Sequence, residues 1–320
     1  MKRTLLIAAL CVLTLQARAA TYYVIVSGLG GEPDFDQRFT AAANDLNKAF
    51  AAADPSAHVI TLTGANSTAA KLKEALTAVA GLAKPDDDFA LIIIGHGTFD
   101  GTEYKFNLVG PDITAAELAT LCDHIASRRQ LIVDTTSSSG GAIPALERPG
   151  RAMIAATKSG TEKNATVFAR YFVEAFQDPS ADTDKSDSIS AMEAFSYAAR
   201  KTADFYDSQK RLATEHAVFN DVGAGDPVRE AAGDQGKLLS SITLLRFGAE
   251  QQAANDPAKR ALLDQKDELE QKIDMLKYRK AAMDPADYKN QLRDALLQLA
   301  QVQQQLDSGV AAEPSSGGAK

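Results

Sequence analysis

Short apolar runs alternate along the first half of the chain with segments whose apolar residues recur every three or four positions. This alternation is typical of a parallel sheet covered by helices on both faces. The predicted strands are residues 22–26, 59–62, 89–94, 130–134 and 152–156, and the predicted crossover helices include residues 39–50, 68–80 and 114–127. Residues 102–108 are expected to form a small hairpin at the carboxyl end of the sheet. The fold class is therefore α/β, with a mostly parallel sheet in a three-layer domain.

After the fifth strand the pattern becomes helical, over residues 165–176 and 189–206, and then weakens into a Gly- and Asp-rich loop. One globular domain over residues 21–248 accounts for these segments. Two long helices follow, each opened by an Asp-Pro-Ala triplet that places Asp at the N-cap and Pro at the first helical position. Leucines recur along both helices at the spacing of an interhelical seam. Residues 249–308 therefore predict an antiparallel helical hairpin, and residues 309–320 a disordered tail.

The first twenty residues have the pattern of a cleaved secretory signal. Lys2 and Arg3 precede an apolar run over residues 5–15, and small residues end the segment at Ala19-Ala20. The run is shorter than the roughly 20 residues that span a bilayer, and no later segment reaches that length. We expect a secreted or periplasmic protein without a membrane span.

Composition narrows the classes of partner. The chain is 45% hydrophobic and 24% charged, which is typical of a globular protein. Without Lys2, Arg3 and Arg18, 31 basic residues stand against 42 acidic ones, a net charge of −11. This charge argues against nucleic acid or anionic lipid as the partner. Cys122 is the single thiol beyond the signal, so no internal disulfide is expected, and its apolar helical context predicts a buried, inert side chain.

Candidate chemistry follows two of the predicted strands, at the edge where an open parallel sheet meets its ligands. His96 lies between two glycines after the third strand, and the amide of Gly97 is placed to donate to an oxyanion. A run of hydroxyl side chains and glycines, residues 134–141, follows the fourth strand. Because these strands are expected to be neighbours, His96 and this run are candidates for a base and a nucleophile.

Together these features resemble the caspase and legumain clan of cysteine peptidases, over residues 21–230. That clan has a five- or six-stranded parallel sheet, a His-Gly after the third strand and an Asp/Glu-x-Cys-x-Ser-Gly motif after the fourth. In this sequence the position of the Cys falls on Ser137, aligned from Ser139-Gly140, or on Thr136, aligned from Asp134. A hydroxyl is a much weaker nucleophile than a thiol and needs a well-oriented base.

Two functions follow from this departure. In the first, the protein is a catalytically degenerate relative that binds a peptide or protein segment at His96 and Ser137, while the hairpin associates with a partner. In the second, it is an active endopeptidase in which Ser137, or else Thr136, attacks a peptide carbonyl, His96 is the general base, and the amide of Gly97 holds the oxyanion.

Two acidic residues are candidates for substrate recognition. Where legumain has Tyr-Arg-His after the first strand, this chain has Phe35-Asp36-Gln37, so the resemblance does not carry over asparagine specificity. Asp36 takes the place of a pocket residue. Asp134 precedes the nucleophile position, where an acidic residue in metacaspases favours a basic substrate side chain.

A second signal is the acidic segment 182–193. Oxygen-bearing side chains at Asp182, Asp184, Ser186 and Ser190 and a Glu at position twelve, Glu193, match the ligand spacing of an EF-hand loop, so Ca²⁺ is the candidate cofactor. Asp187 stands at position six, where EF-hands have Gly. The alternative is a solvated loop in which Ser190 caps the next helix and Glu193 completes a capping box.

Overall fold

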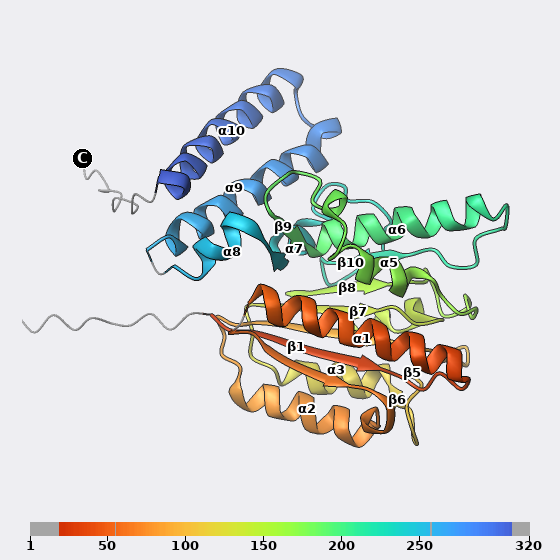
Figure 1. Cartoon of the computed structure of the whole chain (residues 1–320). Coiled ribbons are helices and arrows are strands. Elements are labelled where there is room, and N and C mark those ends of the chain that lie inside the picture. Colours follow the sequence, from red (N-terminus) through yellow and green to blue (C-terminus); the bar gives the residue numbers. More distant parts are fainter. Residues whose placement is uncertain (1–18, 55, 257, 309–320) are drawn as a thin grey trace, which may run out of the picture.

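The computed structural model describes residues 19–54, 56–256 and 258–308, and its centre is a six-stranded sheet in the order β10-β8-β7-β3-β1-β2 (Figure 1). All five predicted strands are present and mutually parallel: β1 (Thr21–Ser27), β2 (His58–Leu62), β3 (Asp88–Ile94), β7 (Arg129–Asp134) and β8 (Arg151–Ala155). The sixth strand, β10 (Val218–Asn220), pairs antiparallel with β8. The α/β fold class with a mostly parallel sheet is confirmed.

Helices cover both faces of this sheet. On one face lie α1 (Pro33–Ala53), α5 (Phe168–Glu174) and α6 (Ala191–Ser208), and on the other α2 (Ala69–Leu82) and α3 (Ala115–Asp123). Alternate residues of β1 divide between the two cores, Tyr23 and Ile25 on the first face, Val24 and Val26 on the second. This alternation in a strand buried on both faces gives the predicted three layers.

Two predictions about the smaller elements need correction. The segment 215–236, predicted as a loop, contains β10, which has only three residues and is held by the fully buried ring of Phe219. The hairpin predicted over residues 102–108 is part of a three-stranded antiparallel sheet of β4 (Gly97–Phe99), β5 (Tyr104–Phe106) and β6 (Ile113–Thr114). This small sheet begins directly after His96.

Short elements complete the domain. They are the helix α4 (Ile143–Leu146), the one-turn 3-10 helices η1 (Gly64–Asn66), η2 (Ser139–Gly141) and η3 (Pro179–Ala181), the antiparallel pair β9 (Ser188–Ser190) and β11 (Thr243–Arg246), and the helices α7 (Lys237–Ser241) and α8 (Gly248–Ala254). Cys122 is fully buried in α3, and burial raises the pKa of its thiol to about 12. The prediction of a buried thiol is therefore confirmed.

The C-terminal hairpin is also confirmed. It consists of α9 (Arg260–Arg279), the short turn η4 (Lys280–Ala282) and α10 (Pro285–Ser308), and it is antiparallel, because Lys259 Nζ donates to the Leu306 carbonyl at 2.7 Å. The second helix begins at Pro285 as predicted. The first begins at Arg260, because Asp256 caps only a turn that includes Ala258.

Buried charges dock α9 against the α/β domain. The ammonium of Lys266, a residue that is 5% exposed, donates to Glu250 Oε1 at 2.6 Å and to the Ser186 carbonyl at 2.5 Å. Arg246 of β11 pairs with Asp267 of α9 at 2.6 Å. These contacts lie on the side of the sheet where the parallel strands begin, so the hairpin packs away from the predicted site (Figure 1).

Three expectations about the chain ends lie outside the described residues or are untested by them. The signal over residues 1–20 falls almost entirely outside the described part, and so does the tail 309–320. The boundary of the domain at residue 248 stays a prediction. Within the described part, no helix combines the length and apolar character needed to cross a bilayer.

Replacing Lys266 by Met tests the docking contact. The substitution keeps the approximate length of the side chain and leaves the buried Glu250 carboxylate with Arg246, at 3.4 Å, as its remaining cation. We expect a loss of about 3 kcal/mol in the free energy of unfolding by urea, the low end for a broken buried ion pair. The double variant Lys266→Met/Glu250→Gln should regain part of the loss. Lys272→Met, on an exposed position of α9, is the matched control, and a loss of equal size there would contradict the assignment.

Candidate functional site

The loops that follow β1, β3 and β7 meet at the carboxyl edge of the sheet. The backbone amide of Gly28 donates to the Ile94 carbonyl at 2.7 Å, and a Cβ on Gly28 would lie 2.4 Å from the Asn107 carbonyl oxygen. Gly95 has a φ of +152° and lies against Gly28. The glycines at the ends of β1 and β3 are therefore required by close backbone packing.

His96 lies half-buried in this edge, on the side of α1. Its ring makes edge contacts with Phe35 and Phe39, at centroid distances of 4.7 and 5.1 Å. Burial lowers the pKa of His96, and a hydrogen bond with the Gly30 backbone opposes this effect. The imidazole is thus held mainly neutral near pH 7, as a general base requires.

Asp36 is linked to His96 through the same glycine. Asp36 Oδ1 accepts a hydrogen bond from the Gly30 amide at 2.7 Å, and a Cβ on Gly30 would collide with the backbone of Asp36 at 2.4 Å. Asp36 of α1 and His96 after β3 therefore both contact the Gly30 backbone. The Asp36 carboxylate closes the loop before α1 and is exposed to solvent.

The Ser137 hydroxyl is hydrogen-bonded to the backbone of Gly97 and not to His96. The Ser137 hydroxyl donates to the Gly97 carbonyl at 3.0 Å and accepts from the Gly97 amide at 3.2 Å. The residue is 3% exposed. The Ser137 hydroxyl, the expected nucleophile, therefore accepts from the Gly97 amide, the expected oxyanion donor, and donates its own proton to the carbonyl of the same glycine.

Gly97 permits this contact because it has no side chain. A Cβ at this position would lie 2.5 Å from the Ser137 carbonyl oxygen and 2.6 Å from Thr136 Oγ1. β4 consequently runs directly against the loop after β7. Any larger residue at position 97 would separate the two segments.

Thr136 and Asp134 are buried beneath the surface of the edge. Thr136 Oγ1 shares a hydrogen bond of 2.7 Å with the Tyr104 hydroxyl, and the Thr136 amide donates to Asp134 Oδ1 at 3.0 Å. Asp134 Oδ2 has no hydrogen-bond partner in the described structure, and burial raises the pKa of this carboxyl to about 6. With both residues at 0% exposure, neither reaches a substrate in this conformation.

The same loop contains a feature that the sequence did not reveal. Ser138 adopts a left-handed conformation, with a φ of +58°, and its amide donates to the Glu162 carbonyl at 2.8 Å. The carboxylate of Glu162 in turn holds His216 Nδ1 at 2.5 Å. An imidazole oriented by a carboxylate thus lies next to the hydroxyl run, contributed by residues far apart in sequence.

An open groove of about 780 Å³ borders the buried loop on the side away from α1. Tyr104 and Gly140 join the loop to the groove, and His96 is not among its lining residues. The walls are formed by apolar side chains and glycine backbone: Phe99, Ala115, Ala116, Gly141, Ile143, Pro144, Ala145, Gly160 and Pro227. A Cβ on Gly160 would lie 2.3 Å from the Phe99 ring, so glycine is required for this wall to close.

The predicted calcium loop gathers three of its five residues. One carboxylate oxygen each from Asp182, Asp184 and Glu193 lie within 4.8 Å of one another. Burial raises the pKa of Asp182 and of Glu193, and the charge of Asp184 adds to both effects. Asp187, at the position of the EF-hand Gly, makes the turn with a φ of +63°.

The two serines of the predicted calcium loop have other partners. Ser186 Oγ bonds to Ser188 Oγ at 3.0 Å, and Ser190 Oγ accepts from the Glu193 amide at 3.2 Å while Glu193 Oε2 accepts from the Ser190 amide at 3.0 Å. This is the capping box of α6, so the capping role predicted for Ser190 and Glu193 is confirmed.

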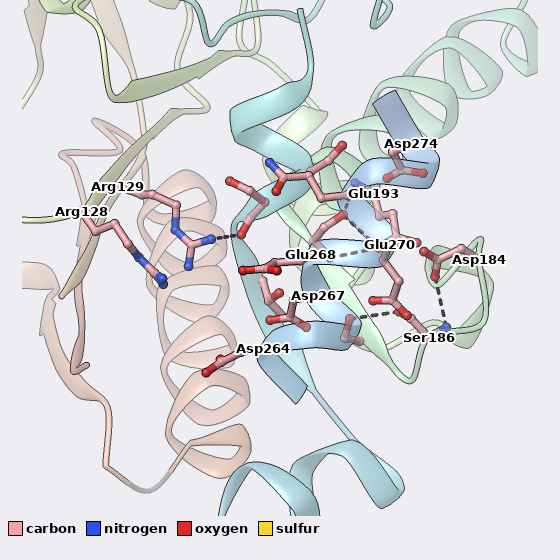
Figure 2. A pocket seen from close by; sticks show the side chains of 16 residues that line it. Arg128, Arg129, Asp184, Ser186, Glu193, Asp264, Asp267, Glu268, Glu270 and Asp274 are labelled. Carbon is pink, nitrogen blue, oxygen red and sulfur yellow. Dashed lines mark hydrogen bonds between the residues drawn. The ribbon is translucent and has the colours of Figure 1, made fainter. Parts of the chain in front are cut away.

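An acidic pocket of about 340 Å³ extends from this loop to α9 (Figure 2). Asp184 and Glu193 face Glu270 across the pocket, and burial raises the pKa of Glu270 to about 8. Arg128 and Arg129 lie on the opposite side, near the start of β7. The sequence does not reveal this convergence, because the acidic residues of α9 are about 80 positions from the loop.

Replacing Asp134 by Asn tests the buried carboxyl. Because the pKa is raised from 3.8 to about 6, the folded state favours the neutral form. Its contribution to stability is full below pH 3.8 and is lost as the pH rises through 6. We expect the free energy of unfolding of the wild type to fall by about 2 kcal/mol relative to Asp134→Asn between pH 4 and 7. Urea unfolding measures this, with Asp204→Asn as the exposed control; parallel curves for wild type and Asp134→Asn contradict it.

Calcium binding by the 182–193 loop has a discriminating variant. Glu193→Gln keeps the capping box but removes the charge. If the loop binds Ca²⁺, we expect a calcium concentration ten times the Kd to raise the melting temperature by about 3–5 °C in the wild type and not in Asp184→Asn/Glu193→Gln. Asp294→Asn, exposed on α10, is the control. The same shift in all three proteins, or none, leaves capping as the role of Glu193.

Comparisons with known proteins give likeness at the level of solved structures. No family model matches the chain, and no curated protein does. A crystal structure of protein GSU0716 from Geobacter sulfurreducens superposes with a TM-score of 0.41 and 13% identity, covering 65% of this chain and 95% of that one. The Drosophila initiator caspase Dronc superposes with a TM-score of 0.41 and 9% identity, covering 66% and 82%. A caspase is thus among the structures that this chain is similar to, and neither likeness bears on what the site does.

Proposed function

We propose that the protein is an exported peptide-binding module that does not cleave what it binds, and that the segment it binds lies in the groove beside the loop after β7. The observation that carries this proposal is the reciprocal contact of Ser137 with Gly97. The Ser137 hydroxyl donates a hydrogen bond to the Gly97 carbonyl and accepts one from the Gly97 amide. The expected nucleophile and the expected oxyanion donor are therefore hydrogen-bonded to each other.

Cleavage would require several changes at once. Ser137 would have to break two hydrogen bonds, turn toward His96 and become accessible from a position that is 3% exposed. His96 is packed between Phe35 and Phe39 and bonded to the Gly30 backbone. A serine nucleophile is activated by a base within hydrogen-bond reach, and here the two side chains have separate partners.

The groove supports binding of an extended segment. Apolar walls bury side chains, and Gly141, which is half-buried at the lining and has no side chain, lets another main chain approach closely. Glu103, Glu147 and Asp226 lie in the lining with a single cation, Lys158. A peptide with apolar residues and a basic side chain is therefore the occupant that fits best, which is the charge preference expected of Asp134 and supplied here by the rim.

Export and association through the hairpin belong to this proposal. The secretory signal predicted over residues 1–20 would place the groove outside the cytoplasm. The outer helix α10 exposes Leu296 and Leu297 at 48% and 58%, while α9 is committed to the domain. Contact of a partner with the hairpin would therefore use α10.

A basic-apolar peptide library tests the proposal in two readouts, cleavage and binding. We expect no cleavage by the wild type, Ser137→Ala or His96→Ala, and binding that Ala145→Trp in the groove weakens by about tenfold or more. Ala51→Trp, on an exposed position of α1, is the matched control and should bind as the wild type does.

The outcomes separate the two functions. Cleavage that is lost in both Ser137→Ala and His96→Ala establishes the active endopeptidase instead. If Ala145→Trp binds the peptide as the wild type does, the peptide lies elsewhere, and the assignment of this groove as the binding site is wrong.

A further inference from the structure

A second groove, of about 500 Å³, runs along one face of α6, far in sequence from the carboxyl-edge loops. The residues of α6 that line it recur every three or four positions. The opposite wall is formed by residues of the loop before α7 and of α9. The lining consists of Met192, Phe195, Ser196, Ala199, Arg200, Ala203, Ala217, Arg229, Glu230, Ala231 and Tyr278.

The floor of this groove lies directly over the main hydrophobic core. Phe195 is 1% exposed and Met192 is 7% exposed, and both belong to the core cluster that covers the sheet. Ala199 and Ala231 pack against the same cluster but are only partly buried. Because these positions carry small side chains, the apolar floor is accessible to a flat or linear apolar molecule.

The walls of the groove are fixed in place. The Tyr278 hydroxyl, from α9, shares a hydrogen bond of 2.7 Å with Ser240 Oγ. At Gly236, which has a φ of +95°, a Cβ would lie 2.6 Å from Ala231, 3.0 Å from Met192 Cε and 3.1 Å from the Tyr278 ring. The loop and α9 therefore close around the floor without spare space at this point.

Two arginines give the groove a local charge opposite to that of the chain. Arg200 and Arg229 are exposed at the lining, and within residues 19–54, 56–256 and 258–308 neither forms an ion pair. Arg200 makes one contact of another kind, with its guanidinium carbon 5.7 Å from the Tyr197 ring centroid. Glu230 is the one carboxylate of the lining, so the groove carries a net positive charge in a chain of net charge −8.

We propose that this groove binds a small apolar molecule that carries a carboxylate, such as a medium-chain fatty acid. The apolar body lies over Ala199, Ala203 and Ala231, where it removes apolar surface from water. The carboxylate lies at the rim, where a guanidinium offers two parallel N–H donors matched to its two oxygens. A pocket with an apolar floor and few polar groups that fix orientation is the usual form of a small-molecule site.

The chemistry of the rim discriminates among ligands. A cation of the same shape would meet two guanidinium groups, and a neutral alcohol would forgo a charge-assisted hydrogen bond. The two arginines therefore select the charge of the ligand's headgroup. The apolar floor of the groove selects the shape of its body. This site is independent of the peptide groove, because the two share no lining residue.

Calorimetric titration of the full chain with decanoate, below its micelle concentration, tests the proposal. We expect saturable binding, a loss of affinity of tenfold or more in Arg200→Gln/Arg229→Gln, and loss of binding in Ala199→Trp, which fills the floor without removing charge. Arg211→Gln, an exposed arginine after α6 that does not line the groove, is the matched control and should bind as the wild type does. Decyltrimethylammonium and decanol serve as ligands of opposite and no charge.

Three results would each contradict one part of the proposal. No heat with decanoate at 1 mM, with the melting temperature showing a folded protein, removes the site. Equal affinity for decanoate, decanol and the ammonium compound removes the role of the carboxylate. Binding that persists in Ala199→Trp places the ligand elsewhere.

Discussion

The approach of β4 to the loop after β7 constrains the whole carboxyl edge of this molecule. Only glycine fits at position 97, because a Cβ would overlap the Ser137 carbonyl oxygen. That close approach buries Ser137, Thr136 and Asp134 together and sets the hydroxyl of Ser137 between the amide and the carbonyl of one residue. The edge that ordinarily presents reactive groups in an open α/β sheet is thereby sealed, and the accessible surface moves to the neighbouring groove.

The opposite edge of the sheet depends on charge. Where β3 and β7 begin, Arg129 pairs with Asp88 at 2.5 Å, and the same region holds Lys266 and Arg246 against Glu250 and Asp267. The Lys266–Glu250 pair is buried and the other two pairs are half-buried; such pairs contribute little net stability but penalise every arrangement that separates them. The pairs of Lys266 and Asp267 fix the position of α9 against the domain, and α9 then supplies a wall to both the acidic pocket and the α6 groove.

The sequence predicts the fold better than the site, for a physical reason. Short runs rich in β-branched and other apolar side chains, such as residues 89–94, favour a buried strand over a helix by their length and composition, and all five strands were expected correctly. β10 was missed because three residues leave no measurable period and its pairing depends on Phe219 reaching a core built by other elements. His96 and Ser137 follow β3 and β7, which are neighbours in the sheet as expected. Which way each side chain turns is decided by partners the pattern does not contain, Phe35 and Phe39 for one and the Gly97 backbone for the other.

Charge distribution gives the strongest reason to treat the two pockets beside α9 as chemically different. Both are walled by the same helix, yet the one toward the 182–193 loop gathers carboxylates until burial holds the pKa of Glu270 at about 8, while the one along α6 carries two arginines without carboxylate partners among the residues described. Acids gathered near one another favour protons or cations even where some of them have cationic partners, as Glu270 has in Lys266, and guanidinium groups without carboxylate partners favour carboxylates. A single docked helix therefore creates sites of opposite preference, and any ligand that binds either one also stabilises the docking of the hairpin, because α9 is part of both.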